Sequence, residues 1–396
     1  MDRLFKPMLL QLGAALMGLV FAVDACSQST LPIPCPTPTA ISDYWEPQSA
    51  DSAGFDAVAL CTVLASVQGS EANIHGVLIA RNGKLVAEMY RAGQDHPINH
   101  LYGLWGQFKA FDAGTLHDVR SISKSVVSLL FGIVSAKSPT HAPNTPVIDL
   151  FPELADLRTT DAVAIQWRHL LAMSSGLDWS EGSPPDNETR LFWSSQPDRY
   201  VLSRSSVAAP GRLFNYNSGG TSLIAEALAR AEGLPIQELG RQHLFDPMGI
   251  TDWEWVPDLH GRALAFTGLR LRPRDLLKLG QLVLNRGQWQ GRQLVPAEWI
   301  DESTRTSLST GFINPILPDE EIGYGYQWWT GHTLWRGQRL AWIAGFGNGG
   351  QRLFVVPDLN LTMVITAGSY NARSIDAHVM RLFANVVASV ECPGCR

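Results

Sequence analysis

Strand-like apolar runs stand at both ends of the chain, and helical patterns lie between them. Near the N-terminus, Val77-Leu-Ile-Ala and Lys84-Leu-Val-Ala-Glu flank Asn82-Gly83, a pair typical of a tight hairpin turn. Near the C-terminus, three further apolar runs separated by Gly-rich or Pro-Asp turns cover residues 340–345, 351–356 and 361–366. Strands early and late in the chain predict one antiparallel sheet in which the two chain ends meet.

Apolar residues at helical spacing predict the remaining elements. Helices are expected over 55–67, 274–285, 296–304 and 375–390. From about 139 to 258 the helical segments are short and broken by proline, which indicates a helical lobe inserted in the middle of the chain. The fold class predicted is therefore α+β, with helices flanking the sheet, while residues 91–118 look irregular.

One more helix is predicted from Ser121, where Ser121-Ile-Ser-Lys124 opens an apolar run that ends before Pro139. Residues three apart share one helix face, so the Lys124 ammonium can lie beside the Ser121 hydroxyl. The unpaired N–H groups of the helix start would point at whatever that hydroxyl attacks. This is a nucleophile with a candidate base, although a serine before a helix is more often only an N-cap.

The chain termini carry targeting and linker features. Residues 1–25 combine basic Arg3 and Lys6 with an apolar run, which predicts an export signal. Cys26 follows a sequence similar to a lipoprotein cleavage box, so lipid attachment at Cys26 and ordinary cleavage are both open. Residues 26–47 are a Pro-rich linker, 48–391 form the main domain, and 392–396 are a Cys-containing tail.

An exported protein can form disulfides, and four cysteines remain beyond Cys26. We expect structural bridges that tie the termini together, from Cys35 or Cys61 to the C-terminal pair Cys392 and Cys395. The connectivity itself cannot be read from the spacing.

Two further segments offer chemistry. Tyr216 lies in a Gly-bounded polar loop over 210–220, directly before a predicted helix. The second segment, Ala344 to Gln351, is glycine-rich but is followed by a strand and lacks a P-loop lysine, which argues against a phosphate site. Such a glycine-rich strand edge lets a substrate carbonyl approach closely.

Read in order, these segments resemble a known family. The similar stretches are Val119-Arg-Ser-Ile-Ser-Lys-Ser, His169-Leu-Leu-Ala-Met-Ser-Ser-Gly-Leu-Asp-Trp, Phe214-Asn-Tyr-Asn-Ser-Gly-Gly, Gly268-Leu-Arg-Leu-Arg-Pro-Arg-Asp-Leu, Tyr324-Gly-Tyr-Gln-Trp-Trp and Gly349-Gly-Gln-Arg-Leu-Phe-Val-Val-Pro. Over about residues 43–390 the chain is similar to the serine β-lactamase and penicillin-binding superfamily, in particular to class C β-lactamase-related esterases and 6-aminohexanoate-dimer hydrolases.

The resemblance implies a β-lactamase/transpeptidase-like fold and an acyl-enzyme mechanism. Ser121 would be the nucleophile, and Lys124 with Tyr216 would be the base system. Burial and a nearby cation would have to lower the Lys124 pKa for it to act alone at neutral pH, whereas a coupled cluster can share one proton. The oxyanion would be held by the Ser121 N–H and by a backbone N–H of the glycine loop, whose candidate residues are Gly345, Gly347, Asn348 and Gly349.

Two departures from the family pattern bear on the substrate. Where many relatives have Tyr-x-Asn, this chain has Tyr216-Asn217-Ser218, so Asn217 or Ser218 would orient the substrate. The glycine loop carries no cation, which favours a small neutral ester or amide over a β-lactam. The alternatives are a β-lactamase, a D-Ala-D-Ala-type peptidase, or a binding protein that kept the fold without turnover.

Other classes of function find less support. There is no Gly-x-Ser-x-Gly elbow, and His169 is expected to start a helix rather than to act in catalysis. The ten histidines show no close ligand spacing, so neither a metal site nor a cofactor is predicted. The net charge of −6 and the lack of a basic stripe argue against a nucleic-acid partner.

Overall fold

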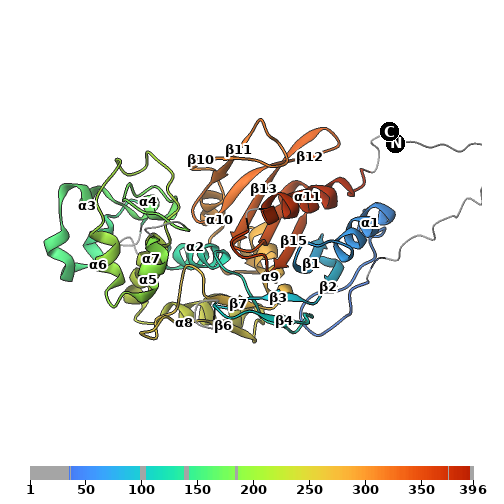
Figure 1. Cartoon of the computed structure of the whole chain (residues 1–396), viewed down its shortest axis with the longest axis horizontal. Helices are drawn as coiled ribbons and strands as arrows, with labels where there is room; N and C mark the ends of the chain where they lie inside the picture. The colour runs from blue at the N-terminus through green and yellow to red at the C-terminus, as the bar shows by residue number, and fades with distance from the viewer. Residues whose placement is uncertain are drawn as a thin grey trace, which may run out of the picture.

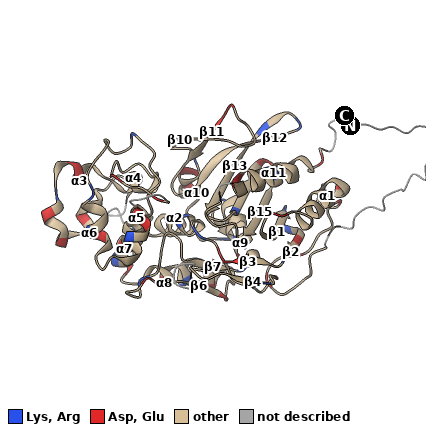
Figure 2. Ribbon diagram, in the orientation of Figure 1, with Lys and Arg blue, Asp and Glu red and all other residues tan. Residues whose placement is uncertain are grey.

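A computed structural model describes residues 35, 37–98, 104–137, 142–182, 186–372 and 374–392. The predicted export signal, Cys26 and Cys395 lie outside these residues. Within the described ranges, no helix has the length and apolar character needed to cross a membrane. Acidic and basic residues are interspersed along the described ribbon (Figure 2).

An eight-stranded antiparallel sheet is the centre of the larger part of the molecule (Figure 1). In spatial order its strands are β10 (Leu308–Ile313), β11 (Glu321–Tyr324), β12 (Trp329–Trp335), β13 (Gln338–Gly347), β14 (Gln351–Val356), β15 (Leu361–Ala367), β1 (Ile74–Arg81) and β2 (Lys84–Tyr90). Strand β1 pairs with β15, so the two chain ends meet in one sheet as predicted. The turn between β1 and β2 has positive φ at both Asn82 and Gly83, which is the twist a two-residue hairpin requires.

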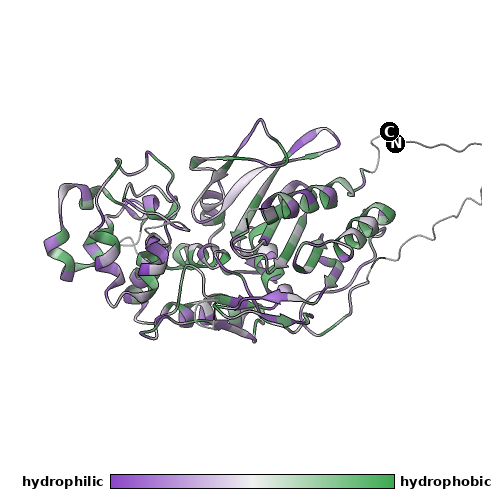
Figure 3. Ribbon diagram, viewed as in Figure 1, coloured by the Kyte–Doolittle hydropathy of each residue, from purple (hydrophilic) through white to green (hydrophobic). Residues whose placement is uncertain are grey.

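Helices cover both faces of this sheet, because successive residues of a strand point to opposite sides. On one face, Ile79 and Phe354 pack with α1 (Ala57–Gln68) and α11 (Ser374–Ala388). On the other face, Leu78 and Leu353 belong to the core shared with helices α2 (Ile122–Ser135) and α9 (Pro273–Leu284). The apolar strands therefore lie between two layers of helices (Figure 3).

A helical lobe lies on the far side of α2 from the sheet (Figure 1). Its helices are α3 (Thr160–Ala164), α4 (Trp167–Leu171), α5 (Asn187–Trp193), α6 (Pro197–Leu202), α7 (Ser218–Glu232) and α8 (Ile236–Gly240). Short 3-10 and π turns η2 (Val147–Leu150), η3 (Pro152–Leu157), η4 (Arg241–Phe245) and η5 (Asp246–Met248) connect them. The predicted helices at 274–285, 296–304 and 375–390 are confirmed as α9, α10 (Ala297–Ser303) and α11, each within a few residues.

Several short strands were not predicted. The region 91–118, expected to be irregular, contains β3 (Gly93–Asp95), β4 (Gln107–Lys109) and β5 (His117–Asp118). Strand β5 joins β7 (Leu269–Leu271) and β6 (Trp253–Trp255) in a small sheet directly before Ser121. The remaining elements are β8 (Gln288–Trp289), β9 (Arg292–Gln293) and η6 (Pro357–Leu359).

The predicted disulfide pairing is wrong. Cys35 bridges to Cys61, so the N-terminal arm is tied to α1 and not to the C-terminal pair. Cys61 lies in α1, and its Cα is 4.7 Å from that of Cys35. Cys392 is disulfide-bonded as well.

Candidate active site

Ser121 lies at the start of α2, which is buried along almost its whole length between the sheet and the helical lobe. The Ser121 side chain makes no capping hydrogen bond to the helix, so its hydroxyl is left for other partners. Lys124 follows one turn later, and its Nζ donates to Ser121 Oγ at 3.1 Å and to the Phe266 carbonyl oxygen at 3.0 Å. The predicted helix start and the predicted Ser–Lys contact are both confirmed.

Tyr216 reaches the same point from the segment before α7. The Lys124 ammonium lies 4.8 Å from the centre of the Tyr216 ring. Ser121 and Lys124 both lie close enough to the Tyr216 hydroxyl to oppose the rise of its pKa. The structure thus brings together three side chains that are separated by almost a hundred residues of sequence.

The electrostatics of Lys124 differ from the expectation of a lowered pKa. Burial lowers the pKa of Lys124, but negative charge on Tyr216, Glu181 and Glu188 raises it, and the net pKa lies above the ordinary value. Burial also raises the pKa of Tyr216, against the opposing effect of the Lys124 charge. The described side chains that shift the Lys124 pKa most are Tyr216, Glu181 and Glu188, and none of them is a cation, so a proton shared within the cluster is the consistent description.

Glu181 and Glu188 are the site residues that the sequence analysis missed. Glu181 Oε1 accepts hydrogen bonds from Trp179 Nε1 at 2.7 Å and from the Ser218 N–H at 2.5 Å. Burial and the neighbouring charge of Glu188 raise the pKa of Glu181 to about 8. The only sequence signal was indirect: Glu181 follows the family-like stretch that begins at His169, in a loop that sequence cannot orient.

The structure places Asn217 and Ser218 at the start of α7. Asn217 Oδ1 caps the helix by accepting from the Gly220 N–H at 3.0 Å, and Ser218 Oγ donates to Glu188 at 2.9 Å. The Asn217 side-chain nitrogen is buried and has no hydrogen-bond partner among the described residues. Of these two candidates for orienting a substrate, only Asn217 therefore has an uncommitted donor.

The glycine segment runs alongside the start of α2. Gly345 and Gly347 belong to strand β13 and pair with β14, so the strand predicted over 340–345 is confirmed at Gly345 and continues through Gly347, which was assigned to the loop. A side chain at Gly347 would come within 2.4 Å of the Val119 carbonyl oxygen, and one at Gly345 within 2.9 Å of Ile122. Glycine is thus required for this strand to pass so close to the nucleophile.

The other two glycine-segment candidates lie in the turn after β13. The Asn348 side-chain amide is held by Asn371, with contacts of 2.7 and 2.8 Å. Gly349 has φ of +92° and packs against Tyr370, an arrangement that a larger residue would strain.

Aromatic side chains form one wall beside Tyr216. Trp329 stacks on Tyr216, with ring centres 5.9 Å apart, and on Phe346 at 5.3 Å. Tyr324 and Phe214 contact the same tryptophan. This wall is apolar, and its nearest cation, Arg352, is committed to Asp376.

The other serines near Ser121 have structural partners. Ser123 Oγ donates to the Arg120 carbonyl oxygen and Ser125 Oγ to that of Gln327, both at 2.7 Å. His169 Nδ1 accepts from the Gln166 N–H in the capping box of α4, which confirms its structural role.

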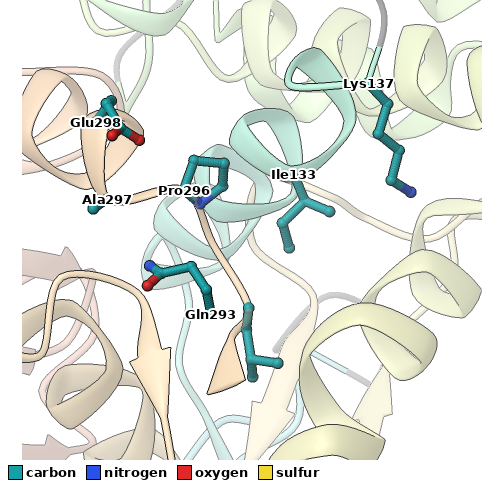
Figure 4. Close-up of a pocket in the computed structure, with 7 residues that line it drawn as sticks. Ile133, Lys137, Gln293, Pro296, Ala297 and Glu298 are labelled. Atoms are coloured by element: carbon teal, nitrogen blue, oxygen red, sulfur yellow. The ribbon is translucent and has the colours of Figure 1, made fainter. Parts of the chain in front are cut away.

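A pocket of about 470 Å³ opens elsewhere, at the C-terminal end of α2 (Figure 4). Its lining includes Ile133, Lys137 and Pro296. Ile133 is twelve residues beyond Ser121, about 18 Å along a helix, so this pocket is separate from the Ser–Lys–Tyr cluster.

An antiparallel sheet flanked by helices, with a serine and a lysine one turn apart on a buried helix beside it, defines the β-lactamase and penicillin-binding fold. A family model described as Beta-lactamase matches residues 67–384, and the chain belongs to this family. Membership of this family indicates a serine hydrolase related to the β-lactamases.

Individual relatives agree with this assignment. The chain is 24% identical over 306 residues to the 6-aminohexanoate-dimer hydrolase of Paenarthrobacter ureafaciens, covering 72% of this chain and 70% of the relative. A penicillin-binding protein homologue from Caulobacter crescentus superposes with a TM-score of 0.64 at 16% identity, covering 84% and 96% of the two chains. EstCE1, a hydrolase with promiscuous acyltransferase activity, gives a TM-score of 0.64 at 16% identity, with 85% and 99% coverage.

Proposed function

We propose that the protein forms an acyl-enzyme on Ser121 and cleaves a small, neutral ester or amide. The observation that carries this proposal is the contact of Ser121 Oγ with Lys124 Nζ at 3.1 Å, with the Tyr216 hydroxyl at the same point. A serine with no capping bond, beside two groups able to share its proton, is an activated nucleophile.

The proposed reaction has two steps. Ser121 Oγ attacks the carbonyl carbon, and its proton passes to the Lys124 and Tyr216 cluster and then to the leaving alcohol or amine. Water, losing its proton to the same cluster, then cleaves the acyl-enzyme and restores the serine. The Ser121 N–H and a backbone N–H at the end of β13 would hold the oxyanion, because a strand passes the nucleophile there without intervening side chains.

The charges near the cluster support a neutral substrate. An acid group on the substrate would add negative charge beside Glu181 and Glu188, where burial and the charge of Glu188 already raise the pKa of Glu181 to about 8. The two arginines closest to the glycine strand are engaged: Arg352 pairs with Asp376, and Arg120 contacts Asp118 and lies over Tyr370. The aromatic wall around Trp329 supplies an apolar surface for the acyl or leaving group.

The names of the relatives point in the same direction, since they include a 6-aminohexanoate-dimer hydrolase and a carboxylesterase. The Cys35–Cys61 bridge supports export to an oxidising compartment, as the N-terminal segment predicts.

The test compares wild type with Ser121→Ala, using short-chain nitrophenyl esters, a chromogenic cephalosporin and a fluorophosphonate probe. Wild type should hydrolyse the ester, leave the cephalosporin largely intact and carry the probe, whereas Ser121→Ala should lose at least about a thousandfold in kcat and all labelling. Ser128→Ala is the matched control, because this serine lies on the same helix and its hydroxyl has no partner among the described residues.

Equal labelling of wild type and Ser121→Ala would overturn the choice of nucleophile. Faster turnover of the cephalosporin than of the esters would overturn the substrate class. Lys124→Ala and Tyr216→Phe should each lose roughly a hundredfold or more in kcat with an unchanged circular dichroism spectrum, and near-normal turnover in either would exclude that residue as a base.

A further inference from the structure

A buried cluster of two histidines and an aspartate lies apart from the Ser–Lys–Tyr cluster. His75 is on β1, Asp95 on β3 and His117 on β5, and each is at most 1% exposed. One ligand atom from each residue lies within 4.8 Å of the others. No short motif marks this group in the sequence, because 42 residues separate the two histidines.

The proton on His117 can be placed from its partner. His117 Nδ1 lies 3.0 Å from the Asp118 carbonyl oxygen. A carbonyl oxygen can only accept a hydrogen bond, so Nδ1 carries the hydrogen. The other ring nitrogen of the neutral imidazole, Nε2, then carries a lone pair.

The proton on His75 follows in the same way. His75 Nε2 lies 3.1 Å from Asn73 Oδ1. The orientation of the Asn73 amide is fixed by Gln94, since Asn73 Nδ2 donates to the Gln94 carbonyl oxygen and Oδ1 accepts from the Gln94 N–H. His75 Nε2 therefore donates, and His75 Nδ1 carries the lone pair.

These assignments set two lone pairs against each other. His75 Nδ1 and His117 Nε2 are 2.8 Å apart, and with both outer nitrogens protonated neither can donate to the other. Only a positive charge between them, a proton or a metal ion, turns this contact into an attraction.

We propose that His75 Nδ1, His117 Nε2 and a carboxylate oxygen of Asp95 bind a divalent transition-metal ion of the zinc type. Two imidazoles and a carboxylate are a ligand set that zinc accepts, and each histidine directs its outer N–H to an oxygen, as metal-bound histidines do. Tetrahedral zinc would hold the two nitrogens about 3.3 Å apart, so the rings need to separate by only about 0.5 Å.

The surroundings indicate a structural role for this site. Side chains at Gly93 or Gly368 would come within 2.7 Å of the His75 ring, so backbone encloses the cluster closely. The Tyr370 hydroxyl donates to Asp95 at 2.7 Å, and the Arg120 guanidinium lies over the Tyr370 ring, 4.1 Å from the ring centre. Arg120, with φ of +53°, directly precedes Ser121. The ion would thus fix β1, β3 and the segment that delivers the nucleophile.

The experiment uses the full exported chain, stripped with a chelator and dialysed into metal-free buffer. On adding Zn²⁺, wild type should take up one ion per chain by elemental mass spectrometry and unfold at a higher temperature. Replacing Zn²⁺ by Co²⁺ should give the visible d–d absorption of a site with nitrogen and oxygen ligands.

His117→Asn and His75→Asn should lose the bound ion and the thermal shift. His332→Asn is the matched control, because His332 is an exposed histidine paired with a carboxylate outside the cluster, and it should keep both. Wild type that binds no stoichiometric metal at neutral pH, or His117→Asn that binds as tightly as wild type, would overturn the proposal.

The metal measurements on wild type do not require any variant to fold. Fluorophosphonate labelling of Ser121 is a separate measurement and does not depend on their outcome. An absent metal with one proton shared between the two rings, detected by nitrogen NMR of the imidazoles, would likewise overturn the metal assignment.

Discussion

Glu181 controls the charge state of the residues beside it, although it belongs to none of the family-like motifs. Once Glu181 ionises, above its own pKa of about 8, its negative charge is one of the contributions that raise the pKa of Lys124. At neutral pH, the raised pKa of Lys124 keeps a proton on the Ser–Lys–Tyr cluster, so the cluster cannot act as a base. We therefore expect kcat/KM of wild type to rise towards alkaline pH, as the cluster loses one proton.

Glu181→Gln should move this alkaline rise to lower pH. Glutamine can still accept hydrogen bonds from Trp179 and the Ser218 N–H but carries no charge, so the pKa of Lys124 falls and the base form appears earlier. The expected shift is roughly one pH unit in a profile of kcat/KM for a nitrophenyl ester.

Asp178→Asn is the matched control, because Asp178 lies three residues earlier on the surface, paired with Arg204. Its profile should follow wild type. A Glu181→Gln profile that stays in place or moves to higher pH would show that Glu181 does not hold the proton on Lys124.

The same glutamate illustrates what sequence could supply at the residue scale. Ser121 and Lys124 could be named as candidates because they share a helix turn, and Tyr216 because it lies in a Gly-bounded loop, but their catalytic roles were implied by the resemblance to the family. The upward shift of the Lys124 pKa could not be predicted. It depends on acidic side chains from a different segment, and tertiary packing sets how close they come to Lys124. The two histidines of the proposed metal site come together for the same nonlocal reason.

At the scale of elements, helix α2 must be held rigidly if Ser121 is to keep its position. Trp299 of α10 crosses α2 at Gly132 and donates its Nε1 hydrogen to the Ser128 carbonyl oxygen at 2.8 Å. On the lobe side, Gln327 donates to the Leu170 and Leu171 carbonyl oxygens, each at 3.1 Å, while its own carbonyl accepts from Ser125. These contacts link α2 to α10 and α4.

Gly132→Ala should destabilise the protein by about 1–3 kcal/mol, because the new methyl group would lie 2.1 Å from the Trp299 ring. Urea denaturation followed by tryptophan fluorescence measures the change. Gly69→Ala serves as a control, since a side chain there meets nothing within 4 Å. An unchanged midpoint for Gly132→Ala would mean that α10 can move away from α2 without loss.

Long elements with a clear apolar period were predicted well, and short ones were not. Helices α2 and α9 and strands β14 and β15 follow their patterns closely. Strands of two or three residues, such as β3 and β5, carry no period of their own and exist because a partner strand lies beside them. Strand β13 extends through Gly345 to Gly347 against the low strand propensity of glycine, because it pairs with β14 and must pass close to α2.

At the scale of the whole molecule, the two chain ends meet in one sheet. The N-terminal segments must therefore pair with C-terminal segments, which are synthesised last. Strand β1 lies between β2 and β15, and the Phe55 segment pairs with Val390. The antiparallel sheet from both ends could be predicted, because both ends had strand patterns and the middle had none. The covalent tie of the N-terminal arm was mispredicted, because the spacing of cysteines does not say which of them meet in space.

The Cys35–Cys61 bridge closes a separation of 26 residues that holds the arm against α1. A loop of this size restricts the unfolded chain, so the double variant Cys35→Ala, Cys61→Ala should lose about 3 kcal/mol in free energy of unfolding. Ester turnover at low temperature should stay near wild type, because the bridge is on the far side of the sheet from α2 (Figure 1).

Denaturant unfolding of both proteins, with and without reductant, measures the loss. Any further loss when the double variant is reduced belongs to the bridge at Cys392, whereas equal stability of the double variant and the oxidised wild type would show that the arm is held by its packing alone.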